Sequence, residues 1–249
     1  MFAYLSIRRT KIPFFVFPHG MLDPWFRYQY PFRHLKKLLV WPWAVYIPLK
    51  SADGVCFTCE QERILARDSF SMYTCKELVV NYGTLGIPNP SKDYSSEFIR
   101  AHPEIALKKR LLFLGRLTPK KGLDILLLAI SELRSRGLWN PEEMVLIVAG
   151  PSEGGYLDKL KRLSASIGIP NSVKWTGMLR GDSKWGAFQS SRSFILPSHQ
   201  ENFGIAVAEA LSCSIPVLLT HKVNIAPEIV ASGAGFAEPD NRAGIVRLL

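Results

Sequence analysis

The sequence predicts an α/β protein with two domains, and two patterns support this class. From about residue 110 onward, short runs rich in aliphatic residues alternate with amphipathic segments at the spacing of βαβ units. The first hundred residues show the same alternation with fewer strands. With 249 residues, of which 47% are hydrophobic, the chain has enough apolar material for two cores. We expect an incomplete α/β domain over residues 1–104 and a Rossmann-like domain over residues 105–249.

The elements expected in the second domain alternate regularly. Strands are predicted at residues 111–114, 145–148, 173–175, 194–196 and 215–218. Helices are predicted at about residues 122–136, 155–167, 182–190, 204–213 and 226–231. This alternation is typical of a doubly wound parallel sheet with helices on both faces.

The first domain is expected to hold too few strands for a well-covered sheet. Its predicted elements are a strand at 14–17, a helix near 33–46, a strand at 54–58 with a helix to about 68, and a strand at 76–80. The polar, proline-rich stretch 86–94 is interpreted as a linker between the two domains.

Positive charge is concentrated in the first fifty residues. The formal net charge is +10, and residues 1–50 hold eight basic residues and one acidic residue, Asp23. Basic residues mixed with tryptophan are what an anionic membrane surface or an anionic substrate selects. No zinc-finger spacing or aromatic RNA-binding signature occurs, so we expect no nucleic-acid partner. The residues concerned are Arg8, Arg9, Lys11, Arg27, Arg33, Lys36, Lys37 and Lys50, with Trp25, Trp41 and Trp43.

The remaining composition predicts a cytoplasmic protein, peripheral at the inner face of the membrane. Basic residues interrupt the start of the chain before any signal-peptide core. The longest apolar run, 38–49, contains two prolines and is shorter than the roughly 20 residues of a spanning helix. Cys56 and Cys59 form one Cys-x-x-Cys without a second pair, so we interpret them as small apolar residues and expect no metal site.

The loop after the strand at 111–114 is basic, and two of its three cations lie at its ends. Arg116 leaves the strand and Lys121 precedes the next helix, with Gly115 and Gly122 beside them. Cations beside backbone amides at a helix amino end suit a diphosphate. The alternative interpretation is a solvated basic turn.

The loop after the strand at 194–196 leads into an Ala-rich, aliphatic helix that contains one acid. Glu201 precedes this helix and Glu209 lies within it, where a carboxylate needs a partner. Two carboxylates with the Gly204 amide between them suit the hydroxyls of a sugar. Taken singly, an acid at the position of Glu201 is more commonly an ordinary loop acid, and Glu209 could equally be an outward-facing helix residue.

Two further strand exits hold candidate residues. Gly150 follows the strand at 145–148. A glycine at this position could let a ligand approach the backbone, or it could be required only by a tight turn. His19 follows the strand at 14–17, where an imidazole can hydrogen-bond a substrate hydroxyl or serve the structure alone.

Taken together, these segments resemble the family 4 retaining glycosyltransferases of GT-B fold. The resemblance is clearest over about residues 109–240. Its strongest part is the Glu-x7-Glu spacing of Glu201 and Glu209. The segments that carry it are Gly115-Arg116-Leu117, Lys121-Gly122, Pro197-Ser198, Glu201-Asn202-Phe203-Gly204 and Glu209.

The resemblance implies roles for individual residues. Arg116 and Lys121 would hold the donor diphosphate, Glu201 and the amides of 202–205 would meet the sugar, and Glu209 would bind the ribose. His19 resembles the histidine that the family brings to the donor sugar, which makes Glu201, His19, Arg116 and Lys121 the expected catalytic set. The expected donor-binding set is Gly115, Arg116, Lys121, Gly150, Met178, Ser198, Glu201, Asn202, Phe203, Gly204, Ile205 and Glu209.

The resemblance also implies a reaction. A sugar would pass from a nucleoside-diphosphate sugar to an acceptor, a cell-envelope glycan or lipid-linked intermediate, with retention at the anomeric carbon. The donor phosphate would accept the acceptor's proton, and cations would stabilise the leaving diphosphate. This scheme requires no metal or other cofactor, and the sequence contains no Asp-x-Asp.

Complete members of the family begin with a strand and a Gly-rich loop and continue beyond the position of Leu249. The resemblance therefore predicts a chain truncated at both ends, with an incomplete acceptor site. A non-catalytic sugar-nucleotide or membrane-binding remnant is the alternative that this truncation favours. A nicotinamide-dependent dehydrogenase is disfavoured, because no Gly-x-Gly-x-x-Gly follows a strand.

Overall fold

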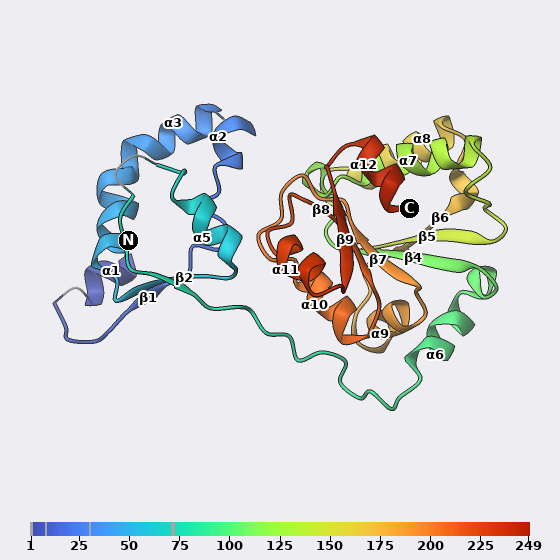
Figure 1. The fold of residues 1–249 in the computed structure, drawn as a ribbon, viewed down its shortest axis with the longest axis horizontal. Coiled ribbons are helices and arrows are strands. Elements are labelled where there is room, and N and C mark those ends of the chain that lie inside the picture. Colours follow the sequence, from blue (N-terminus) through green and yellow to red (C-terminus); the bar gives the residue numbers. More distant parts are fainter. Residues whose placement is uncertain (1, 8, 30, 71–72) are drawn as a thin grey trace. The chain divides into compact units, whose positions relative to one another are not determined.

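The computed structural model describes residues 2–7, 9–29, 31–70 and 73–249, which form two compact units (Figure 1). The units are Met1–Tyr82 and Gly83–Leu249. This division lies earlier in the chain than the boundary expected between residues 104 and 105. Helix α6 (Tyr94–Ala101) packs on α9 (Gly181–Gln189), where a Cβ on Gly186 would lie 2.5 Å from the Tyr94 carbonyl oxygen. Residues 83–104 therefore belong to the second unit.

The second unit is built on a six-stranded parallel sheet with the order β6-β5-β4-β7-β8-β9. Its strand order reverses between β4 and β7, as in the Rossmann arrangement. The doubly wound parallel sheet expected from the sequence is confirmed. The strands are β4 (Lys109–Leu114), β5 (Met144–Ala149), β6 (Val173–Gly177), β7 (Ser193–Leu196), β8 (Val217–Thr220) and β9 (Gly235–Glu238).

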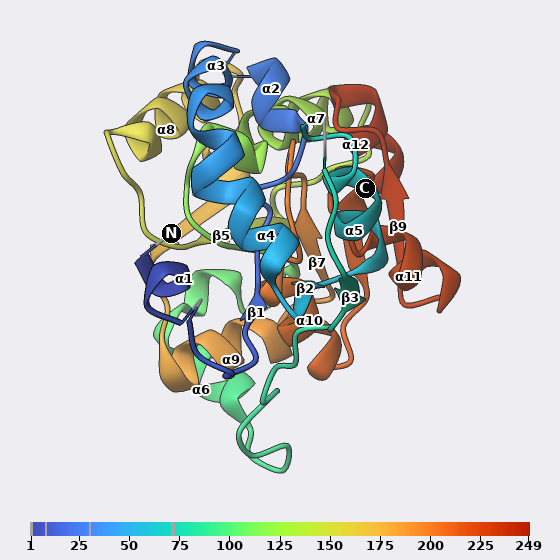
Figure 2. The ribbon, with the colours of Figure 1, turned by 90° about the vertical axis from the view of Figure 1, so that its left-hand side faces the viewer.

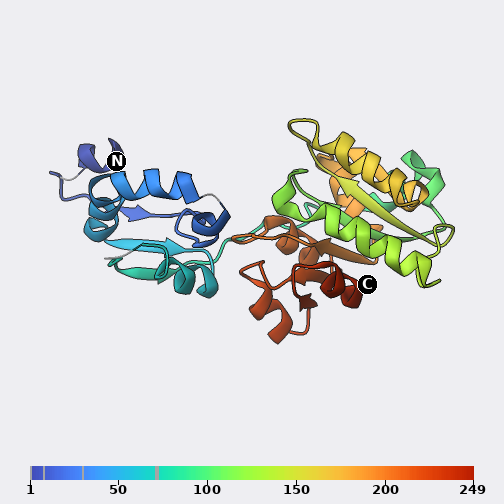
Figure 3. The same ribbon diagram turned by 90° about the horizontal axis from the view of Figure 1, so that it is seen from above.

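Helices cover both faces of this sheet (Figures 1 and 3). Helices α7, α8 and α12 lie on one face, with α7 packed against both α8 and α12. Helices α9, α10 and α11 lie on the other face. Their bounds are α7 (Leu123–Ser135), α8 (Tyr156–Ser166), α10 (Ile205–Ser212), α11 (Ala226–Ala231) and α12 (Arg242–Leu248), and short 3-10 helices span Pro103–Ile105, Pro119–Lys121 and Pro170–Ser172.

One strand and two α-helices of this unit were not expected from the sequence, and neither were its short 3-10 helices. Strand β9 is a short edge strand without β-branched residues, and its Phe236 is exposed, so it lacks the usual strand signal. Helix α12 is short and contains Gly244, which weakens a helix. Helix α6 begins at the end of the expected linker 86–94, where Asp93 caps it by accepting a hydrogen bond from the Ser96 amide.

The first unit contains a three-stranded parallel sheet with the order β1-β2-β3. The helix expected near 33–46 begins earlier and continues through a π-helical segment (Trp41–Tyr46) into α4, as Figure 2 shows. Helices α1 and α2 were not expected, and strand β1 is only two residues long. The elements are α1 (Phe2–Ile7), β1 (Phe15–Val16), α2 (Trp25–Gln29), α3 (Pro31–Val40), α4 (Ile47–Ser51), β2 (Gly54–Phe57), α5 (Glu60–Ala66) and β3 (Glu77–Val79).

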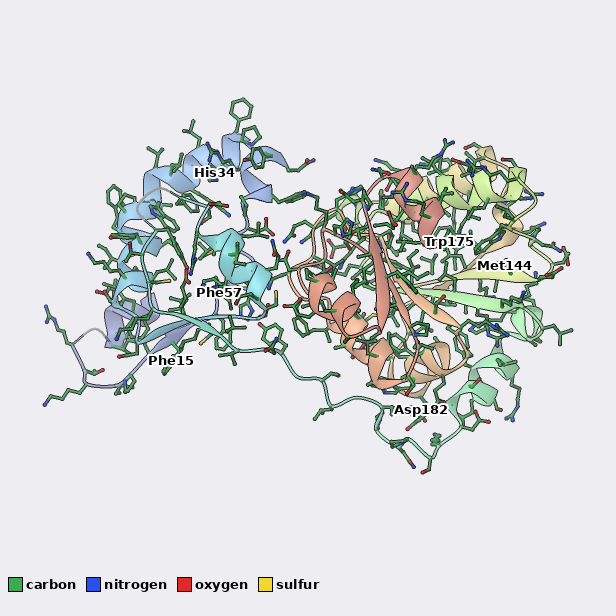
Figure 4. The ribbon with its side chains drawn as sticks, in the orientation of Figure 1. Phe15, His34, Phe57, Met144, Trp175 and Asp182 are labelled. Atoms are coloured by element: carbon green, nitrogen blue, oxygen red, sulfur yellow. The ribbon has the colours of Figure 1, made fainter. Side chains whose placement is uncertain are left out.

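Strand β2 forms the centre of the small core. Val55 and Phe57 are fully buried, and Phe57, labelled in Figure 4, packs with Leu22, Trp41 and Leu49. Cys56 and Cys59 are buried as well, and none of the four cysteines forms a disulfide. The two thiols of the Cys-x-x-Cys therefore occupy the buried environment that apolar residues usually fill.

Two glycines of the second unit stand where loops approach each other too closely for a side chain. Gly122 has φ +66°, and a Cβ there would lie 2.0 Å from the Pro197 carbonyl oxygen. Gly150 has φ +144°, and a Cβ there would lie 1.9 Å from the Gly115 carbonyl oxygen. The loop after β4 is thus packed between the loops after β7 and β5.

We predict that Gly122→Ala destabilises the second unit far more than Gly137→Ala. Both glycines are left-handed, but nothing lies within 4 Å of a Cβ on Gly137. The two variants share the cost of the backbone conformation, so their difference measures the contact with Pro197. We expect the free energy of unfolding in urea to fall by at least ~2 kcal/mol more for Gly122→Ala. Equal losses would show that the two loops separate freely.

Candidate functional site

The two loops that the sequence singled out are neighbours at the point where the strand order reverses. Strands β4 and β7 pair directly, so their carboxyl ends lie side by side. The His199 amide donates to the Lys120 carbonyl oxygen at 2.9 Å, which joins the loops. In open α/β sheets, ligands bind in the crevice at this switch point.

The loop after β4 is held by its own amides. The Gly115 amide donates to the Ala149 carbonyl oxygen at 3.0 Å, and the Leu117 amide donates to the Pro151 carbonyl oxygen at 2.8 Å. Lys121 also uses its amide internally, donating to Thr118 at 2.9 Å. The Gly115, Leu117 and Lys121 amides therefore stabilise the loop, and the exposed Arg116 side chain remains the main group that it offers to an anion.

An ion pair connects the two loops. Lys121 Nζ contacts Glu201 Oε2, and the side chains are only 17% and 16% exposed. From the sequence, Lys121 was expected at the diphosphate and Glu201 at the sugar, and their pairing was not expected. A mostly shielded pair of this kind places a cation and a carboxylate within reach of one ligand.

The backbone of Glu201 is anchored on both sides. Its amide donates to the Lys222 carbonyl oxygen at 2.9 Å, and its own carbonyl oxygen accepts from the Asn224 amide at 3.0 Å. The loop after β8 thus fixes the position of Glu201. Lys222 and Asn224 escaped the sequence analysis, because backbone bonds between distant loops leave no pattern in the sequence.

Gly204 turns the chain into α10. It has φ +80° and precedes Ile205, the first residue of the helix. The first helical amides, of Ile205 and Ala206, have no intrahelical partner at this position. They add the positive end of a helix to the Glu201 side of the site.

Glu209 has the partner that its apolar surroundings require. Its Oε1 accepts a hydrogen bond from Lys184 Nζ at 2.8 Å, and the lysine comes from α9. The same ammonium group lies 4.2 Å from the centroid of the Trp185 ring. The sequence indicated that a partner must exist, but it did not identify Lys184.

Burial raises the pKa of the neighbouring Cys213 thiol above its usual value, which keeps that thiol protonated.

The other expected donor-binding residues differ in exposure. Met178 follows β6 and is exposed, whereas Phe203 is buried under the loop. Ser198 is fully buried, and its carbonyl oxygen accepts from the Thr220 hydroxyl. Gly150 is packed against Gly115, so its lack of a side chain serves loop packing. Direct donor contacts from Ser198 and Gly150 remain predictions.

His19 belongs to the other compact unit. It follows β1, is exposed, and has φ +49°, which is uncommon for a residue with a side chain. Its Nδ1 contacts the Tyr82 hydroxyl. His19 thus lies at the carboxyl ends of the strands of the small sheet. Arg116 and Glu201 likewise follow the carboxyl ends of strands in the larger sheet.

Within residues 2–7, 9–29, 31–70 and 73–249, no group of three or more His, Cys, Asp or Glu side chains is arranged to hold a metal ion. In the same ranges, no helix has the length and hydropathy needed to cross a membrane.

Curated proteins similar to this chain include several glycosyltransferases. A D-inositol 3-phosphate glycosyltransferase of Rhodococcus jostii is 30% identical over 205 residues, which cover 75% of this chain and 43% of that protein. One of Salinispora arenicola is 34% identical over 109 residues, covering 43% of this chain and 24% of that protein. The chain therefore spans less than half the length of these relatives.

Solved structures of similar fold match almost the whole chain. Sucrose-phosphate synthase from Thermosynechococcus elongatus matches with a TM-score of 0.75 at 17% identity, covering 99% of this chain and 60% of that one. HepE from Anabaena, solved in complex with UDP and glucose, matches with a TM-score of 0.75 at 22% identity, covering 98% and 62%. These likenesses support the GT-B type of fold expected from the sequence.

The family model described as glycosyl transferases group 1 matches residues 95–246, which is more than half of the chain. These residues contain both loops of the switch point, with Lys121, Glu201 and Glu209. The protein belongs to the glycosyl transferases group 1 family.

Proposed function

We propose that this chain binds a nucleoside-diphosphate sugar at its switch point and serves its transfer to an acceptor with retention of anomeric configuration. The observation that carries the proposal is the ion pair between Lys121 and Glu201, which joins the two loops where a ligand of this fold class binds. A cation for phosphate and a carboxylate for hydroxyls are thereby held side by side.

The diphosphate is assigned to Arg116 and Lys121. Arg116 is exposed beside the end of β4, and its guanidinium can form two parallel hydrogen bonds to phosphate oxygens. Lys121 is held in place by Glu201 before any ligand arrives. Charge that develops on the leaving diphosphate would therefore meet cations that are already oriented, which is the main source of electrostatic catalysis.

The sugar is assigned to Glu201 and the amino end of α10. Glu201 accepts hydrogen bonds from hydroxyls through oxygens of its carboxylate, and the first amides of α10 donate to others. Because the Glu201 backbone is anchored on both sides and its carboxylate pairs with Lys121, the side chain is held with little freedom. Such rigidity favours discrimination among sugars.

The ribose is assigned to Glu209. Lys184 binds Oε1 of this carboxylate, and we assign the second oxygen, Oε2, to the ribose hydroxyls. The lysine would hold the carboxylate in one orientation. His19, from the first unit, is assigned to the donor sugar.

The reaction that follows from these assignments is a same-face displacement. The bond between the anomeric carbon and the diphosphate breaks, the acceptor hydroxyl forms the new bond on the same face, and a leaving phosphate oxygen takes the hydroxyl proton. Arg116 and Lys121 stabilise the resulting diphosphate. The scheme uses no metal ion or other cofactor.

We further propose a glycan or lipid-linked acceptor, with the protein in the cytoplasm and peripheral at the membrane. Its support is the helical run of α3 and the π-helical segment, where Phe32 is 83% exposed and Trp43 is 61% exposed, and which also carries Lys36 and Lys37. Exposed aromatic residues mixed with cations suit the boundary of an anionic bilayer. Of the cations counted in the sequence, Arg8 and the side chain of Arg33 lie outside the described part.

A second candidate function is binding without transfer. A sugar-nucleotide or membrane-binding role without turnover would use the same Lys121–Glu201 pair and the same exposed surface of α3. Measurement of sugar transfer and of nucleotide binding on the same preparation separates the two. Binding without any release of nucleoside diphosphate would favour the second candidate.

We predict that Arg116→Ala weakens nucleoside-diphosphate binding at least about tenfold, because a charge-assisted contact to phosphate is lost. Isothermal titration with UDP, GDP and ADP measures the affinity. Arg162→Ala, an exposed arginine on α8, is the matched control and should leave the affinity unchanged. Unchanged affinity in Arg116→Ala, or no binding of any of the three nucleotides to the unaltered chain, would contradict the assignment.

We predict that Glu209→Gln separates ribose binding from phosphate binding. The affinity for the best nucleoside diphosphate should fall about tenfold, while the affinity for inorganic pyrophosphate should change less than about twofold. Glu228→Gln, an exposed acid on α11, serves as control. An equal loss for both ligands would mean that Glu209 supports the site as a whole and does not contact the ribose.

We predict salt-sensitive binding to anionic vesicles through α3. The double variant Lys36→Ala/Lys37→Ala should reduce cosedimentation with phosphatidylserine-containing vesicles at low salt, because each cation near the surface adds to the attraction. Lys159→Ala/Lys161→Ala on α8 is the control with the same change in net charge. Equal losses in both variants, or no cosedimentation of the unaltered chain, would remove the membrane proposal.

A further inference from the structure

The turn that carries His19 has an unusual backbone. His19 has φ +49° and Gly20 has φ +74°, so two successive residues are left-handed. Glycine adopts this conformation freely, but a residue with a side chain does so at a cost. Such a residue persists where its surroundings hold it, and it is often found at functional sites.

Glu62 holds this turn. The residue lies on α5 and is 4% exposed, and its Oε1 accepts a hydrogen bond from the Gly20 amide at 2.7 Å. Its Oε2 accepts from both the amide and the hydroxyl of Thr58, each at 2.7 Å. Buried carboxylates are stable when hydrogen bonds satisfy them, and this one has three. The carboxylate thereby ties the turn after β1 to the end of β2.

Tyr82 holds the ring. Its hydroxyl contacts His19 Nδ1, and the two ring centroids lie 5.8 Å apart. Phe17 flanks both rings, with centroids 5.9 Å from His19 and 6.5 Å from Tyr82. Tyr82 follows β3, so the ends of all three parallel strands converge on the histidine.

We propose that Glu62 and Tyr82 are positioning residues for His19: Glu62 fixes the backbone of its turn, and Tyr82 fixes its tautomer. The Tyr82 hydroxyl donates to Nδ1, which leaves the proton on Nε2, where the imidazole donates to a hydroxyl of a bound ligand. The role of that ligand contact rests on the proposed function of His19. The positions of the backbone and the ring do not depend on it.

The Tyr82 hydroxyl has the proton that this hydrogen bond requires. Burial, and then the negative charge of Glu62, raise the pKa of Tyr82 above its usual value, so the hydroxyl keeps its proton. A neutral imidazole that accepts at Nδ1 must carry its proton on Nε2. In histidine sites generally, the hydrogen-bond partner of one ring nitrogen determines whether the other nitrogen donates or accepts a hydrogen bond.

The test uses the full chain labelled with ¹⁵N-histidine, because nitrogen chemical shifts report which ring nitrogen holds the proton. The signal of His19, one of five histidines, is identified by its loss in His19→Gln. We expect a single tautomer with the proton on Nε2 in the unaltered chain. Tyr82→Phe should mix the tautomers without lowering the melting temperature, because Tyr82 is only half-buried.

Glu62→Gln should also shift the His19 signals toward those of a free histidine. Both carboxylate oxygens of Glu62 accept hydrogen bonds, and in glutamine an amide nitrogen, which cannot accept, replaces one of them. Glu60→Gln is the control, since Glu60 is exposed on the same helix and pairs with Arg63. It should leave the signals unchanged.

Two results would overturn the inference. If Tyr82→Phe leaves the tautomer unchanged, Tyr82 does not position the ring. If Glu62→Gln lowers the melting temperature but leaves the His19 shifts as they were, Glu62 serves only stability. None of these readings involves a nucleotide, so failure of the proposed function would appear in the titrations and would leave the NMR result standing.

Discussion

The site depends on the close approach of the loops after β4 and β7. Parallel pairing of these strands brings their carboxyl ends together, and Gly122 allows the backbone of one loop to touch Pro197 of the other. Only then does Lys121 reach Glu201. Because the pair is mostly shielded from water, both side chains are held before a ligand binds, and the ligand need not order them.

Three carboxylates in different places share one physical requirement. Glu201 pairs with Lys121, Glu209 pairs with Lys184, and Glu62 accepts three hydrogen bonds. Each is largely removed from water, so each needs charge or hydrogen-bond donors from another element. The positions of these acids are therefore set by tertiary contacts. Each contact joins residues that lie on different helices, strands or loops.

Much of the second unit could be predicted from local pattern. Buried strands such as β5 and amphipathic helices such as α8 have strong periodicity, and all five expected strands and five expected helices of this unit are present within a few residues. The edge strand β9 and the short helices α6 and α12 were missed, because exposed or short elements carry weak signals. In the first unit, the helix near 33–46 was expected, but its π-helical form over Trp41–Tyr46 and its continuation through Pro48 as α4 were not.

The sequence by itself determined the fold class, the two loops and the chemical type of residue in each, since periodicity and strand-end positions are local properties. It also indicated that Glu209 needs a partner. Only the tertiary structure decided that the partner is Lys184, that Lys121 meets Glu201, and that the buried Glu62 supports the turn of His19. The reason is that ion pairs and buried hydrogen bonds join residues far apart in the chain. The sequence contains many cations and hydrogen-bond donors that could partner each carboxylate, and only folding brings a particular one within reach.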